Sequence, residues 1–201
     1  MNEINTNLID QASRYVSNIL DEELPANCVW HTKDHTFDVL KNVELIGNYY
    51  NLNENDLNIL RLAALFHDVG YVKLYSDHEL QSAEIAATFL NSKGIPDSDV
   101  TLIKTSILAT KVPQQPKDLF SKILCDADLM HLSYENYFEQ IEYMREEWNL
   151  TGQVSYTEKE FHVNSLHFFY AHSYHTRYGR LILEPKKKMN RERIKNRIAE
   201  L

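Results

Sequence analysis

Glycine and proline are scarce in this sequence, with five residues of each among 201. Sheet-rich folds need turn residues about every ten positions, so this scarcity favours long helices. Cysteine is rarer still: Cys28 and Cys125 are the only two, and neither lies near another cysteine in a zinc-like spacing. We interpret them as two buried thiols of a protein from a reducing compartment.

The N-terminal residues contain no basic patch followed by an apolar run, and no stretch approaches the ~18 apolar residues of a membrane span. Basic residues are fewer than acidic ones, 21 against 29, so the formal net charge is −8. An acidic protein repels polyphosphate backbones at long range. The sequence therefore predicts a cytoplasmic protein with no membrane partner and no stable nucleic-acid partner. The basic residues within 186–197 indicate the solvated face of a C-terminal helix, with a phosphate-attracting rim as the alternative.

Apolar residues recur at helical spacing along most of the chain, and no stretch shows strict two-residue alternation. Asn53 is predicted to cap one helix at its start, and Gly70 to close it. We therefore expect an all-α protein with a single domain over residues 1–201. The helices are expected at about 4–20, 34–50, 54–69, 77–94, 97–107, 119–128, 134–148 and 157–177, before a short basic helix.

Histidine and aspartate gather in three apolar segments. These are VWHTKDHTFDVL (29–40), LAALFHDVGY (62–71) and KILCDADLMHL (122–132). The doublet His67-Asp68 follows an apolar helix, so it is expected to be buried, and an ionised aspartate there is costly unless a cation pairs with it. The same reasoning applies to Asp126 and Asp128. Buried acids with histidines nearby indicate a metal site with nitrogen and oxygen ligands.

Two imidazoles and two carboxylates without a thiolate suit a divalent ion such as Mn, Fe, Co, Ni, Mg or Zn. Four protein ligands around an octahedral ion leave about two positions for water and a substrate oxygen. The pattern therefore predicts a catalytic site and not a structural one. The isolated histidines His131, His162 and His167 are interpreted as packed or surface residues.

The order His35, His67-Asp68 and Asp128, in the contexts HTFDV, LFHDVGY and DADL, resembles the HD superfamily of metal-dependent phosphohydrolases. The resemblance covers most of residues 30–145 and is strongest to small stand-alone members. It implies an HD-domain/phosphodiesterase-like helical bundle with helices over 155–201 packed on the core. It also implies one divalent ion held by these four residues.

The same resemblance implies hydrolysis of a phosphomonoester or phosphodiester in a nucleotide or another small phosphorylated metabolite. On this resemblance Asp128 is assigned to the metal, which leaves Asp126 to orient a water. His31 is similar to a histidine that protonates the leaving oxygen in cyclic-nucleotide phosphodiesterases, and a surface histidine is the alternative. His78 matches a position that binds a second ion or phosphate in relatives. With Asp68, these residues are the predicted catalytic set.

A second ion is not expected, because the segment KTSILATKV lacks the histidines of two-metal relatives. Lys104 and Lys111 are interpreted as surface charges, with a phosphate contact as the alternative. His172 and His175 belong to an aromatic, basic segment that either lines the site or packs its tyrosines in the core. Two other functions stay open: a non-enzymatic nucleotide-binding sensor, and a di-iron oxygenase of the same fold. The substrate and the oligomeric state are not fixed by the sequence.

Overall fold

The computed structural model describes residues 3–152 and 154–201. Over these residues the chain is helical and contains no β-strand, which confirms the predicted all-α class. It consists of two compact units: the chain up to Pro25 with His31–Asp128, and Ala26–Trp30 with Leu129–Leu201. The single domain over 1–201, with its C-terminal helices on the core, stays a prediction. No described helix is long and apolar enough to cross a membrane.

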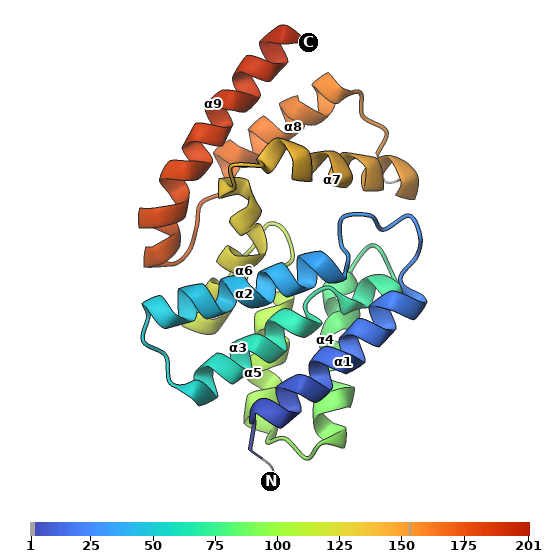
Figure 1. The fold of residues 1–201 in the computed structure, drawn as a ribbon, viewed down its shortest axis with the longest axis vertical. Helices are drawn as coiled ribbons and strands as arrows, with labels where there is room; N and C mark the ends of the chain where they lie inside the picture. Colours follow the sequence, from blue (N-terminus) through green and yellow to red (C-terminus); the bar gives the residue numbers. More distant parts are fainter. Residues whose placement is uncertain (1–2, 153) are drawn as a thin grey trace. The chain divides into compact units, whose positions relative to one another are not determined.

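Helix α3 is the centre of the first unit and contacts α1, α2, α4, α5 and α6 (Figure 1). Every residue from Leu57 to Phe66 is buried except Arg61. A helix that is apolar on nearly all sides needs neighbours around it, and the other helices supply that cover. The elements of this unit are α1 (Thr6–Glu23), α2 (Lys33–Tyr49), α3 (Glu54–Phe66), η1 (Val69–Val72), α4 (His78–Ser92), α5 (Asp97–Leu108) and α6 (Leu119–Asp128).

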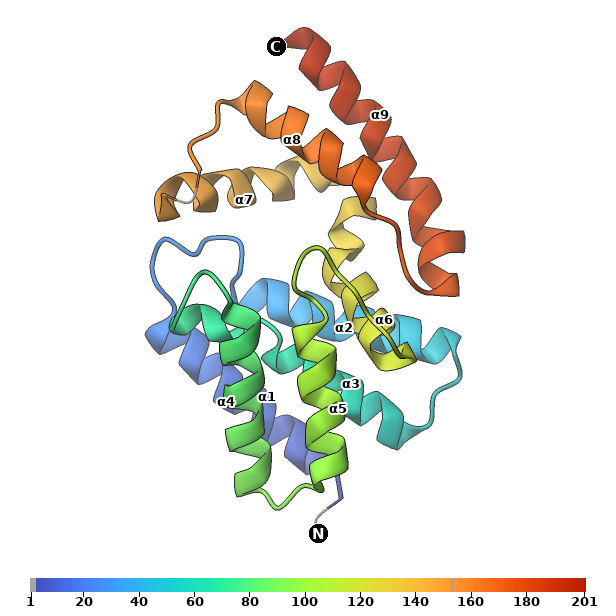
Figure 2. The same ribbon diagram turned by 180° about the vertical axis from the view of Figure 1, so that it is seen from behind.

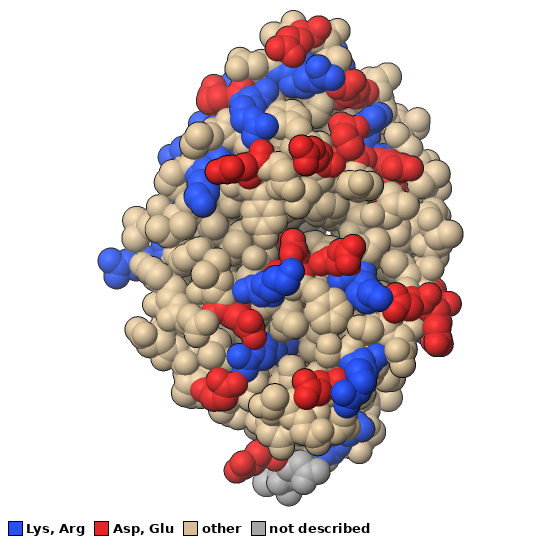
Figure 3. Space-filling model, in the orientation of Figure 1, with Lys and Arg blue, Asp and Glu red and all other residues tan. Residues whose placement is uncertain are grey.

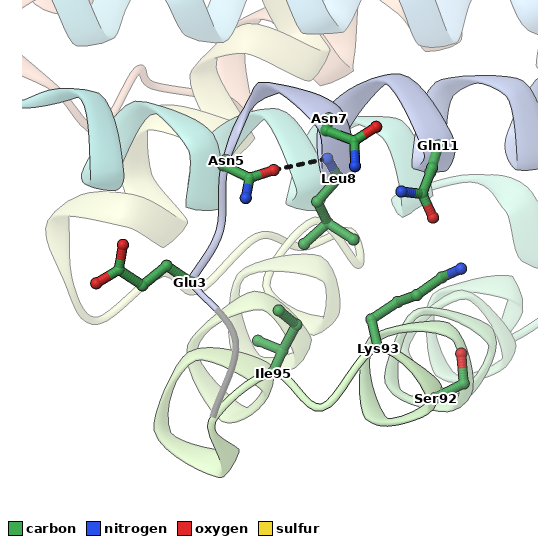
Figure 4. A pocket seen from close by; sticks show the side chains of 8 residues that line it. All are labelled: Glu3, Asn5, Asn7, Leu8, Gln11, Ser92, Lys93 and Ile95. Atoms are coloured by element: carbon green, nitrogen blue, oxygen red, sulfur yellow. Dashed lines mark hydrogen bonds between the residues drawn. The ribbon is translucent and has the colours of Figure 1, made fainter.

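The α4 and α5 helices form an antiparallel pair, which lies side by side in Figure 2. Gly94 makes the turn between them possible, because its φ of 69° is a left-handed conformation that favours glycine. A surface cleft of about 340 Å³ opens between this turn and the start of α1. The side chains of Leu8 and Ile95 point into the cleft, among the amides of Asn7 and Gln11 (Figure 4).

The start of α3 follows the prediction, since the Asn53 side chain accepts a hydrogen bond of 3.0 Å from the Asp56 amide. Its predicted end was wrong: α3 stops at Phe66, before Val69. Gly70 does not close the helix but allows η1 to approach α4. The Gly70 amide donates to Ser82 Oγ at 2.8 Å, and a Cβ at Gly70 would lie 2.0 Å from the His78 carbonyl oxygen.

The second unit has its own apolar core. Its elements are η2 (Leu129–Ser133), α7 (Tyr137–Thr151), α8 (Glu158–Ala171), the π-helical turn η3 (Gly179–Leu183) and α9 (Glu184–Glu200). The core residues are Leu129, Leu132, Tyr137, Ile141, Phe161, Phe169 and Ile194. Thr157 and Glu160 form a capping box that begins α8. The basic C-terminal helix, predicted to be short, runs for 17 residues.

The aromatic helix predicted over 157–177 ends earlier, at Ala171. The chain becomes extended at His172, and the buried Lys187 donates from Nζ to the His172 carbonyl at 2.7 Å. Tyr174 is buried, and its hydroxyl donates to the Leu129 carbonyl at 3.0 Å. Hydrogen bonds to distant residues therefore replace the helical ones after Ala171.

Candidate metal centre

All four predicted ligands belong to the first unit, and each lies near the end of a helix. His35 is in the first turn of α2, His67 directly follows α3, and Asp128 is the last residue of α6. Asp68 follows His67 and precedes η1. The C-terminal end of a helix carries partial negative charge, so the ends of α3 and α6 favour a cation here.

The ligand atoms of these residues lie within a few ångströms of one another. His35 Nε2 is 3.4 Å from Asp68 Oδ2 and 3.3 Å from Asp128 Oδ1. His67 Nε2 is 3.1 Å from Asp68 Oδ2 and 3.8 Å from Asp128 Oδ1. The ligand atoms of His35, His67 and Asp128 all lie within 4.8 Å of one another, a spacing that could hold a metal ion. Asp68 joins the group through its contacts with both imidazoles.

The hydrogen bonds of the site suit a cation. His67 Nδ1 lies 2.7 Å from the Ala64 carbonyl oxygen, which fixes the proton on Nδ1 and turns the Nε2 lone pair toward the carboxylates. His67 Nε2 and Asp68 Oδ2 are both buried and face each other at 3.1 Å, but neither has a partner in hydrogen-bond geometry. Leaving such atoms unsatisfied costs about 1–3 kcal/mol each. A divalent ion would satisfy both, so the residues present fit the metal that the sequence predicts.

The charges of the cluster shift the pKa values of its members in opposite directions. Burial lowers the pKa of His35, but the carboxylates of Asp128 and Asp68 raise it by more, to about 10. Burial raises the pKa of Asp68, but the neighbouring His67 and His35 hold it well below its usual range. The pKa of Asp128 is also lowered, chiefly by His35 against the effect of burial. The site therefore stabilises positive charge between two carboxylates.

Neighbouring side chains fix the ligands in place. The Asn42 side chain donates to the Ala127 carbonyl at 3.1 Å, and this bond ties α2 to the end of α6 that carries Asp128. On the other side, His78 Nε2 lies 3.3 Å from Asp68 Oδ1. Asp68 therefore directs one oxygen toward the ligand histidines and the other toward His78.

The structure brings His31 and His78 close to this cluster. His31 precedes α2, and its ring lies 5.9 Å from that of His35 in an edge-on arrangement. His78 is the first residue of α4, and its Nδ1 lies 3.2 Å from the Tyr75 carbonyl oxygen. Burial lowers the pKa of His78, but Asp68 raises it by more. Asp126 is fully buried on α6 and is not among the residues of the metal-binding group.

Two residues near the cluster were not predicted from the sequence as part of the site. Glu79 is buried, and its Oε1 lies 3.6 Å from His78 Nε2; in the sequence it reads as an ordinary acid in the first turn of α4. Tyr71 is also buried, and its ring stacks on both His31 and His78. The only signal for Tyr71 was its place in LFHDVGY, three residues after Asp68.

The other candidate residues have partners of their own. Lys104 pairs with Glu84 at 2.8 Å, and Lys111 pairs with Asp77. His172 and His175 belong to the second unit. Basic residues of α9 also pair with acids, as Arg197 does with Glu158, and on the face drawn in Figure 3 the two signs of charge are interspersed. These pairs agree with the interpretation of solvated surface charge, but that interpretation was wrong for Lys187, which is buried and donates to the His172 carbonyl.

The family model described as HD domain matches residues 32–160. A predicted HD superfamily hydrolase from an uncultured Thermotogales bacterium is 22% identical, with a TM-score of 0.63 over 93% of this chain and 91% of that one. A Lactobacillus plantarum protein is 16% identical, with a TM-score of 0.71 over 98% of each chain. Bacillus subtilis YpgQ, solved in complex with ADP, is 20% identical, with a TM-score of 0.63 over 97% and 95% of the two chains.

No curated protein matches the chain. The solved structures, each below a quarter in identity, share its fold. The family model spans more than half of the chain and includes the four candidate metal ligands. The order of these residues along the sequence and their proximity in the first unit agree with that match. The chain therefore belongs to the HD domain family.

Proposed function

We propose that this protein is a metal-dependent phosphohydrolase that cleaves a phosphomonoester or phosphodiester bond of a nucleotide or a small phosphorylated metabolite. The observation that carries the proposal is the cluster of His35, His67, Asp68 and Asp128, in which two buried polar atoms have no partner in hydrogen-bond geometry. Carboxylates gathered in this way are costly to the fold unless a positive charge, either a protonated imidazole or a metal ion, lies between them. Its place in an HD domain supports hydrolysis as the reaction.

His35, His67, Asp68 and Asp128 would hold one divalent ion of the group Mn, Fe, Co, Ni, Mg and Zn. A bound divalent ion lowers the pKa of water and neutralises charge that develops on a phosphoryl oxygen. Contacts outside the cluster restrain two of these ligands. The Ala64 carbonyl fixes the tautomer of His67, and His78 restrains the free oxygen of Asp68.

The remaining polar groups would act on the substrate itself. His78 begins α4, and the N-terminal end of a helix favours a phosphate, so His78 is assigned to a phosphate or water contact. His31 lies near His78, with ring centroids 6.2 Å apart. It is assigned to protonation of the leaving oxygen. Asp126, two residues before Asp128, is assigned to the orientation of water through the ligands.

A nucleotide is the favoured substrate class. The related fold of YpgQ was solved with ADP, which supports a nucleotide as a ligand of this chain as well. Two alternatives stay distinct from hydrolysis: a sensor that binds nucleotide without turnover, and a di-iron oxygenase. The second needs further histidine ligands, and residues 97–108 of α5 include none.

The test is a hydrolysis screen with each divalent metal across nucleoside mono-, di- and triphosphates, cyclic nucleotides and generic phosphoesters. Asp68→Ala should abolish metal-dependent phosphate release while circular dichroism retains the helical signal. Asp10→Ala, which removes an exposed carboxylate from α1, is the matched control and should keep wild-type turnover. Undiminished turnover in Asp68→Ala would contradict the mechanism. Tight nucleotide binding without turnover under every metal would favour the sensor, and two irons per chain would favour the oxygenase.

A further inference from the structure

Tyr71 is the one residue of η1 whose ring contacts both predicted substrate-binding histidines. Its centroid lies 3.8 Å from that of His78 and 4.3 Å from that of His31, with planes inclined by 18° and 22°. Its hydroxyl lies 3.2 Å from His31 Nε2, within hydrogen-bond distance. Tyr75 packs edge-on against the Tyr71 ring at 5.1 Å. The Tyr71 side chain is 6% exposed, so these contacts, and not solvent, determine its orientation.

His31 lies two residues before Lys33, the first residue of α2, and its ring also lies near those of His35 and Tyr75. His78 is tied through Nδ1 to the Tyr75 carbonyl and through Nε2 to Asp68. A stack that joins the two rings therefore transmits the fixed position of His78 to His31. The contact between the Tyr71 hydroxyl and His31 Nε2 also restricts the orientation of the His31 ring, because only one of its two nitrogens takes part.

We propose that Tyr71 is a positioning residue that holds the imidazoles of His31 and His78 in one arrangement beside the metal ligand Asp68. The proposal rests on the proposed function, which gives these two histidines their roles toward the phosphate and the leaving group. The plain alternative is that Tyr71 is an ordinary core aromatic. The two differ in the hydroxyl: a core aromatic is replaced by phenylalanine at little cost, whereas a positioning tyrosine loses its bond to His31.

The first test is a double-mutant cycle. Tyr71→Phe keeps the stack and removes the hydroxyl, so kcat should fall about tenfold to a hundredfold with little change in KM. In the His31→Ala background the same change should have no further effect beyond about twofold, because the residue it acts through is gone. Tyr71→Leu also removes the stack on His78, so it should raise KM in both backgrounds. Tyr49→Phe, a half-exposed tyrosine at the end of α2, is the matched control and should be silent.

A second measurement does not depend on turnover. In protein labelled with ¹⁵N-histidine, the ring signals of His31, assigned by their loss in His31→Ala, should move in Tyr71→Phe, while those of His67 should not. If the hydrolysis screen fails but these signals move, the proposed function is wrong and the positioning role of Tyr71 stands. Unmoved His31 signals would overturn the positioning role, and so would a Tyr71→Phe effect on kcat that persists in full without His31.

Discussion

Metal binding to this site should depend steeply on pH. In the metal-free protein the pKa of His35 is raised from 6.5 to about 10, since the carboxylates of Asp128 and Asp68 outweigh the effect of burial. His35 therefore carries a proton at neutral pH, and a histidine binds a metal only without that proton. Each ion bound must displace the proton into solvent. The affinity for the metal should thus rise with pH by about tenfold per unit, or about 1.4 kcal/mol, until pH approaches 10. His67, whose pKa is also raised, adds to this steepness.

Isothermal titration with Mn²⁺ measures this effect directly. Between pH 6.5 and 8.5 the dissociation constant should fall about a hundredfold. At one pH, heats in two buffers of different ionisation enthalpy should report at least one proton released per ion. Asp128→Asn removes a ligand and one of the two carboxylates that raise the pKa of His35, so binding should weaken and its pH dependence should also shrink. His167→Gln, at an exposed histidine, is the control and should behave as the wild type. An affinity that is flat over this range, or that falls with pH, would refute the reasoning.

Three further outcomes are expected. In the presence of chelator, the stability that protonated His35 supplies should be complete below pH 6.5 and should be lost as pH rises through about 10. Urea unfolding midpoints at pH 7 and pH 10 check this, and equal midpoints would contradict it. Asn53→Ala should lower the free energy of unfolding by about 1 kcal/mol in urea, because it removes the cap of α3, and turnover at 25 °C should not change. Phe66→Ala should cost about 3–5 kcal/mol in the same assay, because this side chain is fully buried; a loss under about 1 kcal/mol would argue against that packing.

The sequence predicted the helical class and the order of the helices because both depend on local signals. The apolar run before His67 predicts a buried helix, and the structure has α3 there with Asn53 as its cap. The ends of helices were harder to predict. Nothing near Ala171 in the sequence reveals that Lys187 will donate to the carbonyl of His172, since that bond joins residues 15 positions apart.

In the candidate site, likewise, one part was predictable from the sequence and another was not. Residue type and burial pattern indicated a metal site, and the resemblance to HD proteins assigned its four ligands. The structure brings His35, His67, Asp68 and Asp128 together. The contacts around them were not predictable from one sequence. Tyr71 stacks on His31 across 40 positions of the chain, and no periodicity or motif encodes that distance. The roles of individual residues stay predictions until the variants are measured.

The need for glycine at position 70 also predicts a sequence pattern for other proteins. Any Cβ there meets the backbone of His78 and Ser82, and backbone cannot swing aside as a side chain can. A chain that docks a histidine-bearing helix against its His-Asp doublet in this way must therefore keep glycine two residues after the aspartate. The spacing His-Asp-x-Gly, followed by His and then Ser four residues later, becomes a testable signature of this docking. Where a sequence has a larger residue in place of that glycine, the histidine helix must lie farther from the His-Asp doublet.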